Sequence, residues 1–274
     1  MPWAIVQAKN QCFAIATQDL REMVIMPEVA HVPSVPEYVR GVINLRGRVM
    51  PLLDLRKRMG LPSAVDETEK FCSMMEQREQ DHKNWLNELE ASVKQHRTFA
   101  LTTDPHQCAF GKWYDSYHAD NPWIAALLKK FDTPHQQIHA CAIEVEQLKA
   151  SGDYASAEAL VTRLRDGALS KLIRLFGDLR NLVRESERET AVILTHGSKL
   201  FAASVDAALS IEKFAAGSIE EVSSLVPIAD HGIIRRLGKR AKSNEVVLII
   251  ETDQLMTSSE LEAVLEAEPV GRPS

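Results

Sequence analysis

Residues 32–62 read VPSVPEYVRGVINLRGRVMPLLDLRKRMGLP. The stretch holds two short runs rich in Val, Ile and Leu, VRGVINLRG and RVMPLLDL, which are bounded by Pro and Gly. Short apolar runs of this kind are typical of strands in a small barrel or sandwich. QCFAIAT and MVIMP, earlier in the chain, fit the same pattern. Residues 1–65 are therefore predicted to be strands and turns.

The same pattern returns after residue 190. TAVILTH, KLFAASVDAAL, GIIRRLG and EVVLIIE are strand-length and rich in β-branched residues, and a polar helix is predicted near 257–267. Neither end of the chain holds enough strands for a sheet without open edges. The simplest organisation is one β domain made from both ends of the chain.

The middle of the chain is helical in pattern, because Gly and Pro are rare and apolar residues recur three or four apart. One stripe consists of Phe71, Met75, His82, Trp85, Leu86, Leu89 and Val93. A second consists of Ala157, Val161, Leu164, Ala168, Leu172, Leu175, Leu179 and Leu182. Both approximate a seven-residue repeat, which suits long helices in a bundle. We predict three parts: residues 1–65, a helical insert at 66–185, and residues 186–274.

Composition excludes several classes of protein. The 274 residues are 45% hydrophobic and 26% charged, with a net charge of −6, which argues against a nucleic-acid binder. No apolar run approaches the roughly 18–20 residues of a membrane span, and no signal peptide is recognised. Four irregularly spaced cysteines are too few for a disulfide framework. We expect a soluble, cytoplasmic protein without membrane insertion, and interpret the basic cluster at 46–58 as a solvated face.

Polar side chains interrupt the apolar faces of the insert. His82 lies on the first stripe, and Cys108 follows a DP helix start at which Asp104 can cap. His135 and His139 stand at i and i+4, the spacing at which two imidazoles can bind one ion. Three His and one Cys form a set of four N/S ligands, which favours Zn²⁺ in tetrahedral geometry.

Other interpretations of these residues stay open. A lone His on an apolar face is more often a hydrogen-bonded core residue, and a bare HxxxH is a weak pattern. A core with three imidazoles and no metal would, however, need a partner for every ring nitrogen. Four protein ligands leave zinc no open position, and no Glu lies between the paired histidines as in HExxH, so hydrolysis is not expected. A zinc-dependent enzyme with three protein ligands and a bound water remains the alternative.

HKNW, CAFGKWY and HQQIHACA resemble the His, C-x-F-G-x-W-Y and H-x-x-x-H motifs of the chemoreceptor zinc-binding (CZB) family. That family is a four-helix bundle regulatory domain, and the resemblance implies Zn²⁺ with the ligands His82, Cys108, His135 and His139. Zinc keeps a cysteine as the thiolate that oxidants attack. A purely structural zinc and a zinc- or oxidant-sensing role both remain open.

Residues 32–62 closely resemble the heart of CheW, the adaptor of bacterial chemotaxis. LFAASVDAALSI, GIIRRLG and EVVLIIETDQLM are similar to later CheW segments and follow in the family's order. The two resemblances together imply an α+β multidomain fold: a CheW-like pair of small five-stranded β-barrels interrupted by a zinc-binding four-helix bundle.

The CheW resemblance also implies a function. The chain would be a non-enzymatic adaptor that links chemoreceptor signalling tips to the CheA histidine kinase, with a possible homodimer through the helical insert. The implied receptor-contacting surface involves Gly41 and Arg46, with Asn44 and Gly47 shaping the turn. Turn geometry alone could also explain Gly41, Asn44 and Gly47, and an internal salt bridge could explain Arg46.

Overall fold

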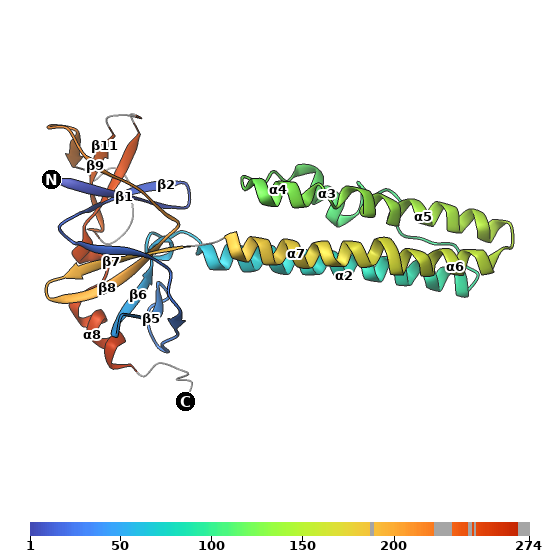
Figure 1. Cartoon of the computed structure of the whole chain (residues 1–274), viewed down its shortest axis with the longest axis horizontal. Helices are drawn as coiled ribbons and strands as arrows, with labels where there is room; N and C mark the ends of the chain where they lie inside the picture. The colour runs from blue at the N-terminus through green and yellow to red at the C-terminus, as the bar shows by residue number, and fades with distance from the viewer. Residues whose placement is uncertain (187–188, 222–231, 241–242, 244, 268–274) are drawn as a thin grey trace. The chain divides into compact units, whose positions relative to one another are not determined.

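The computed structural model describes residues 1–186, 189–221, 232–240, 243 and 245–267. The chain separates into two compact units, one of residues 1–67 and 187–274 and the other of residues 68–186. Strands dominate the first unit and helices the second (Figure 1).

Two sheets make up the first unit, each with six strands among the described residues. One has the order β10-β11-β12-β2-β1-β9, with β1 Pro2–Ala8, β2 Gln11–Ala16, β9 Ala207–Lys213, β10 Ile219–Glu221, β11 Ile234–Lys239 and β12 Val246–Ile250. The other has the order β3-β7-β8-β6-β5-β4, with β3 Leu20–Ile25, β4 Val29–Ala30, β5 Val39–Leu45, β6 Arg48–Asp54, β7 Thr190–His196 and β8 Lys199–Val205.

Each sheet draws strands from both ends of the chain. β2 pairs in parallel with β12, and β6 pairs in parallel with β8. Antiparallel pairs of β1 with β9 and of β3 with β7 also join the two ends. The residues of the helical unit lie in the chain between β6 and β7. Removing either end of the chain would therefore take strands from both sheets.

The sheets differ from the predicted five-stranded barrels. The two-residue strand β4 and the three-residue strand β10 each add a sixth strand at a sheet edge. Within the described ranges, no pairing joins the two edge strands of either sheet, so no closed barrel is formed by these pairings. Strands this short were missed because two or three residues are too few to show alternation.

The largest core cluster of the first unit unites the two sheets. It includes Phe13 of β2 together with Leu53 of β6 and Phe201 of β8. Two C-terminal side chains, Leu261 and Val264, add to it from helix α8 (Ser258–Glu266). The short helix η3 (Thr252–Gln254) precedes α8. Residues that are distant in sequence thus share one apolar core.

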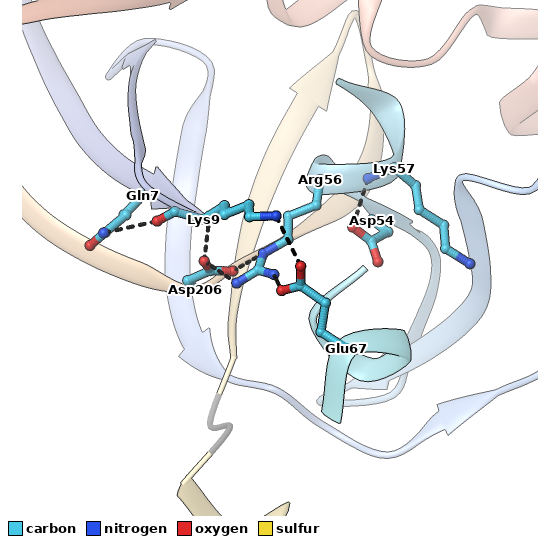
Figure 2. Close-up of polar contacts among 7 residues, drawn as sticks. All are labelled: Gln7, Lys9, Asp54, Arg56, Lys57, Glu67 and Asp206. Atoms are coloured by element: carbon cyan, nitrogen blue, oxygen red, sulfur yellow. Dashed lines mark hydrogen bonds and ion pairs between the residues drawn. The ribbon is translucent and has the colours of Figure 1, made fainter. Parts of the chain in front are cut away.

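A buried ion pair lies beside helix α1 (Leu55–Arg58) in the first unit, as Figure 2 shows. Arg56 donates from Nε to Asp206 Oδ1 at 2.8 Å and from Nη2 to Oδ2 at 2.6 Å, and its Nη1 donates to Glu67 Oε2 at 2.7 Å. Lys9 Nζ donates to Glu67 Oε1 at 2.9 Å. Arg56 is only 9% exposed, and its burial is tolerated because the carboxylates of Asp206 and Glu67 neutralise its charge. The interpretation of residues 46–58 as a solvated face is therefore wrong for Arg56.

Helices α2 to α7 form the helical segment, and α2 begins within the first unit. Their bounds are α2 Ala64–Lys94, α3 Ala109–Ser116, α4 Pro122–Leu128, α5 Asp132–Ala150, α6 Tyr154–Leu164, the π-helical turn η1 Arg165–Leu169 and α7 Ser170–Ser186. The turn η1 connects α6 to α7 without a break. In the described part of this segment there are three long helical runs, namely α2, α5 and the continuous α6–η1–α7, together with the two short helices α3 and α4. The helical insert is thus present, but the number of its helices does not confirm a four-helix bundle.

The helical unit has its own apolar core. Met75, Leu86 and Leu89 of α2 are fully buried, as the first stripe predicts. Leu172 and Leu179 of α7, from the second stripe, are fully buried as well. Both stripes belong to one cluster, which confirms the helical periodicity of the insert.

Candidate metal centre

Four side chains from three parts of the helical unit converge in its core. His82 comes from α2, Cys108 immediately precedes α3, and His135 and His139 come from α5. One potential ligand atom of each lies within 4.8 Å of the others. Bonds of about 2.0–2.3 Å around a tetrahedral ion place ligand atoms roughly 3.3–3.8 Å apart. The cluster would need only a small contraction to bind one ion.

His82 is oriented by its own helix. The side chain is 3% exposed, and its Nδ1 lies 2.7 Å from the carbonyl oxygen of Arg78, one turn earlier. A carbonyl can only accept a hydrogen bond, so Nδ1 carries the proton and Nε2 is left with a free lone pair. Nε2 is buried and has no hydrogen-bond partner in the described structure. This arrangement is common for metal-binding histidines.

His135 and His139 lie on one face of α5, as the i, i+4 spacing predicts. Their ring centroids are 4.9 Å apart, and their exposures are 4% and 1%. His135 Nε2 lies 3.2 Å from Cys108 Sγ. Neither ring nitrogen of His139 has a hydrogen-bond partner of ordinary geometry among the described residues. The Thr102 carbonyl accepts from Trp85 Nε1 at 2.9 Å and acts on His139 only by raising its pKa, against the larger effect of burial.

Cys108 is placed by the start of α3. Its backbone is extended, with φ −71° and ψ 161°, and its sulfur accepts a hydrogen bond from the Gly111 N–H at 3.1 Å. Cys108 is therefore the N-cap of α3, and the prediction that Asp104 caps this helix is wrong. Asp104 Oδ1 instead accepts from the His106 N–H at 2.9 Å, in a turn that precedes the helix. The helix thus begins four residues later than the DP signal indicated.

Zinc fits this group of residues. Three buried ring nitrogens, His82 Nε2 with Nδ1 and Nε2 of His139, have no hydrogen-bond partner within the described chain. Each such orphan costs about 1–3 kcal/mol, and a bound cation would satisfy the nitrogens that face it. Three imidazoles and one sulfur are the donor set that tetrahedral Zn²⁺ prefers.

The electrostatics keep the imidazoles neutral. Burial lowers the pKa of His135 to about 3 and that of His139 to about 4, with further lowering by neighbouring imidazoles. Burial likewise lowers the pKa of His82. Burial raises the pKa of the Cys108 thiol, and the backbone N–H groups of Gly111 and Phe110 act in the opposite direction. All three rings are thus in the protonation state that binds metal.

Aromatic rings surround the cluster. Phe110 lies edge-on to His135 and His82, at 5.0 and 5.8 Å between ring centroids, and Trp85 lies 4.9 Å from His139. A cavity of about 180 Å³ lies beside the cluster and is lined by Asp81, His82, Trp85, Cys108, Ala109, Phe110 and His139. Trp85 and Phe110, which are both buried, therefore pack around the four side chains.

The residues predicted to contact a partner belong to the first unit, where they lie on the β5–β6 hairpin. Arg46 and Gly47 form its two-residue turn with φ of 52° and 82°, and Asn44 Oδ1 accepts from the Gly47 N–H at 3.0 Å. These three residues are exposed. Gly41 is buried on β5, where a Cβ would lie 2.1 Å from the Ala30 carbonyl oxygen. The structure therefore brings together three of the four residues.

An internal salt bridge was one of the open interpretations of Arg46, and the structure contains it, although its partner Glu22 was not predicted. Glu22 on β3 pairs with Arg46 at 3.2 Å, although the Arg46 side chain is 77% exposed. Gly111 donates to the Cys108 sulfur. Nothing in the sequence signals the Glu22 contact, since it depends on the strand arrangement. The Gly111 contact was not predicted either, although the glycine of CAFGKWY was a signal for it, because glycine permits a close approach of two backbone segments.

Two family models match parts of the chain. Residues 3–82 match the family model of the CheW-like domain, and residues 82–146 match that of the chemoreceptor zinc-binding domain. None of the helices in the described ranges has the length and apolar character needed to cross a membrane.

Individual relatives match only short segments. The chemotaxis protein CheW of Bacillus subtilis is 43% identical over 58 residues, which is 20% of this chain and 37% of the relative. CheW of Helicobacter pylori is 45% identical over 49 residues, which is 18% of this chain and 30% of the relative. The chain thus spans about a third of these relatives' length. The scaffolding protein TtCheW of Thermoanaerobacter tengcongensis has a TM-score of 0.45 and 12% identity, over 94% of each chain. The chain carries a CheW-like domain and a chemoreceptor zinc-binding domain.

Proposed function

We propose that this chain is a cytoplasmic, non-enzymatic chemotaxis adaptor that links chemoreceptors to a CheA-type histidine kinase and carries a zinc-binding regulatory insert. In this proposal residues 1–65 and 186–274 are the two parts of the CheW-like domain, and residues 66–185 are the zinc-binding insert. The matches to the CheW-like and chemoreceptor zinc-binding families support both halves of the proposal.

One observation carries the zinc assignment. His82, His135 and His139 are buried around the Cys108 sulfur, and three of their ring nitrogens have no partner among described residues. A folded core rarely leaves polar atoms in this condition. When bound, zinc would hold α2, α5 and the start of α3 together and keep the sulfur as a thiolate.

The proposal that zinc is regulatory concerns the Cys108 sulfur. Four protein ligands leave no open position for an activated water, which supports a non-enzymatic centre. The cavity beside the cluster gives a small oxidant a route to Cys108. Oxidation would remove one ligand from the ion. With a purely structural zinc, oxidation of Cys108 would leave the association with receptor and kinase unchanged as long as the chain stays folded.

The test of the metal centre is metal content. Purified full-length protein should contain about one zinc per chain, and Cys108→Ala and His139→Ala should each lose most of it. His106→Ala is the matched control, because His106 is exposed and pairs with Asp115 outside the cluster. Full zinc occupancy in both ligand variants would refute the assignment. A change in receptor or kinase association that accompanies zinc release by hypochlorite or peroxide separates the sensory role from the structural one.

The proposed partner surface involves Gly41 and Arg46, with Asn44 and Gly47 shaping the turn, and Gly41 is buried on β5. Arg46 offers a planar, permanently charged group to a carboxylate of a receptor helix. Its present partner, Glu22, is 36% exposed, so the pair can open at little cost. Arg46→Glu should weaken co-sedimentation with receptor and kinase and leave zinc content unchanged. Unchanged co-sedimentation would refute this surface.

A homodimer through the helical insert is part of the same proposal. Sedimentation equilibrium of the full chain tests it. A mass of one chain at micromolar concentration would refute it.

A further inference from the structure

Gly111 is a buried residue in the first turn of α3, three positions after Cys108. We propose that Gly111 is the positioning residue for the Cys108 sulfur: it fixes the sulfur for metal binding, and only glycine can do so at this position. The inference rests on the proposed zinc site and adds a residue that is itself no ligand.

Gly111 donates a backbone hydrogen bond to the sulfur of Cys108. The first N–H groups of a helix have no partner within the helix and need an acceptor. Here the acceptor is the Cys108 sulfur, 3.1 Å from the Gly111 nitrogen. This hydrogen bond therefore gives a free N–H group of the first helical turn an acceptor, and it also holds the sulfur in place. It is stronger when the acceptor is a thiolate than when it is a thiol.

The second argument is the space around Gly111. A Cβ there would lie 1.8 Å from the carbonyl oxygen of Pro105, 2.9 Å from its carbonyl carbon and 3.1 Å from the Cα of His106. All three are backbone atoms, so no side-chain rotation can relieve the overlap. Any larger residue must push the Pro105–Cys108 turn away from α3, and that turn carries the sulfur.

The close approach is specific to this place. The Gly111 backbone does not have a positive φ, so glycine is not required there by backbone conformation. Pro105 O also lies 3.3 Å from Cys108 Sγ. The chain from Pro105 to Gly111 thus closes around the sulfur, and the missing Cβ is what permits the closure.

The test compares two glycine substitutions in the full chain. Gly111→Ala should weaken zinc binding roughly 10–100-fold, the range seen when a group that orients a ligand is removed. Gly177→Ala on α7 is the matched control, because a Cβ there meets nothing within 4 Å, and its zinc affinity should stay within about twofold of wild type. The readouts are competition with a chelator and the sulfur-to-cobalt absorption band of the cobalt-loaded protein, which should shift only in Gly111→Ala.

A second variant separates the hydrogen bond from the steric effect and from general misfolding. Glycolic acid at position 111 replaces the N–H with an ester oxygen and adds no Cβ. It should shift the cobalt band and speed zinc release, with wild-type helicity by circular dichroism. Wild-type zinc release and spectra in both variants would overturn the positioning role while leaving the zinc site intact. A wild-type chain that binds no zinc would instead overturn the proposed centre itself.

Discussion

The metal centre and the β5–β6 turn differ in how their residues come together. The four potential ligands come from α2, α5 and the start of α3, and only tertiary packing brings them within 4.8 Å. Asn44, Arg46 and Gly47 are neighbours in one hairpin, which any two-residue turn would bring together. The local chain geometry does not explain why the four potential ligands meet, whereas it does explain the turn. The metal centre is therefore the stronger sign of function.

The two regions also differ in what their polar atoms lack. In the metal centre, buried nitrogens have no partners in the described structure. In the turn, Asn44 and Arg46 already have partners, in Gly47 and Glu22. The metal centre thus calls for a ligand that the chain does not supply, whereas the turn is complete without a partner. The predictions below test this contrast.

The largest expected effect is that of zinc removal on the helical unit. Loss of a zinc held at 1,000 times its dissociation constant removes about 4 kcal/mol of stability from the unit that binds it. A chelator should therefore shift the thermal transition of the helical unit and leave that of the β unit in place. Calorimetry with and without chelator measures this, and His139→Ala should reproduce the chelated curve. A shift of both thermal transitions together would contradict the prediction that only the helical unit depends on zinc.

The next effect concerns the buried ion pair of the β unit. Asp206→Asn removes the negative charge opposite Arg56, whose side chain is 11% exposed, and one of the two acceptor oxygens, and it should cost roughly 3 kcal/mol in urea unfolding. Lys57→Ala is the matched control within the same basic cluster. It breaks the pair of Lys57 with Asp66, whose side chains are 34% and 50% exposed, and should cost under about 1 kcal/mol. Equal losses of unfolding free energy in the two variants would mean that the burial of Arg56 does not strengthen its ion pair.

A smaller loss of stability is expected from alanine substitutions at Gly41 and Gly47, and the two losses should differ. Gly41→Ala should cost roughly 2–3 kcal/mol, because φ is +136° and a Cβ would lie 2.1 Å from the Ala30 carbonyl oxygen. Gly47→Ala meets no atom within 4 Å and should cost only about 1 kcal/mol, through its φ of +82°. Chemical denaturation of both variants checks the order. The reverse order would contradict the view that Gly41 serves the strand pairing.

The sequence predicted some features better than others for physical reasons. The stripes of α2 and α7 were predictable, because helical periodicity over many residues is a strong signal. The histidine pair on α5 was predictable from its i, i+4 spacing. The burial of Arg56 was not, since its partner Asp206 lies 150 residues away. Nor was the N-cap of α3, because Asp104 is a common capping residue and cysteine is not.

The smallest expected effect is an acid-dependent one in the β unit. Burial alone would raise the pKa of the Glu260 carboxyl, but hydrogen bonds from the Tyr38 hydroxyl and from Thr257 lower it below its ordinary value. A lowered pKa means that the stabilisation is present above the unfolded-state pKa, near 4.3, and is lost as pH falls through the folded-state pKa. Glu260 is the third residue of α8 and accepts from the N–H of the N-cap Thr257, so Glu260→Gln removes a charge from this capping box and should cost about 1 kcal/mol at pH 7.

Because the wild-type advantage depends on the ionised carboxylate, the cost of Glu260→Gln should shrink as pH falls from 5 to 3. Urea unfolding of the β transition at several pH values measures it, with Glu262→Gln as the control. Glu262 lies on the same helix and is exposed, and its pKa is lowered only by Lys199. A cost that stayed constant from pH 7 to 3 would show that Glu260 acts through its shape and not its charge.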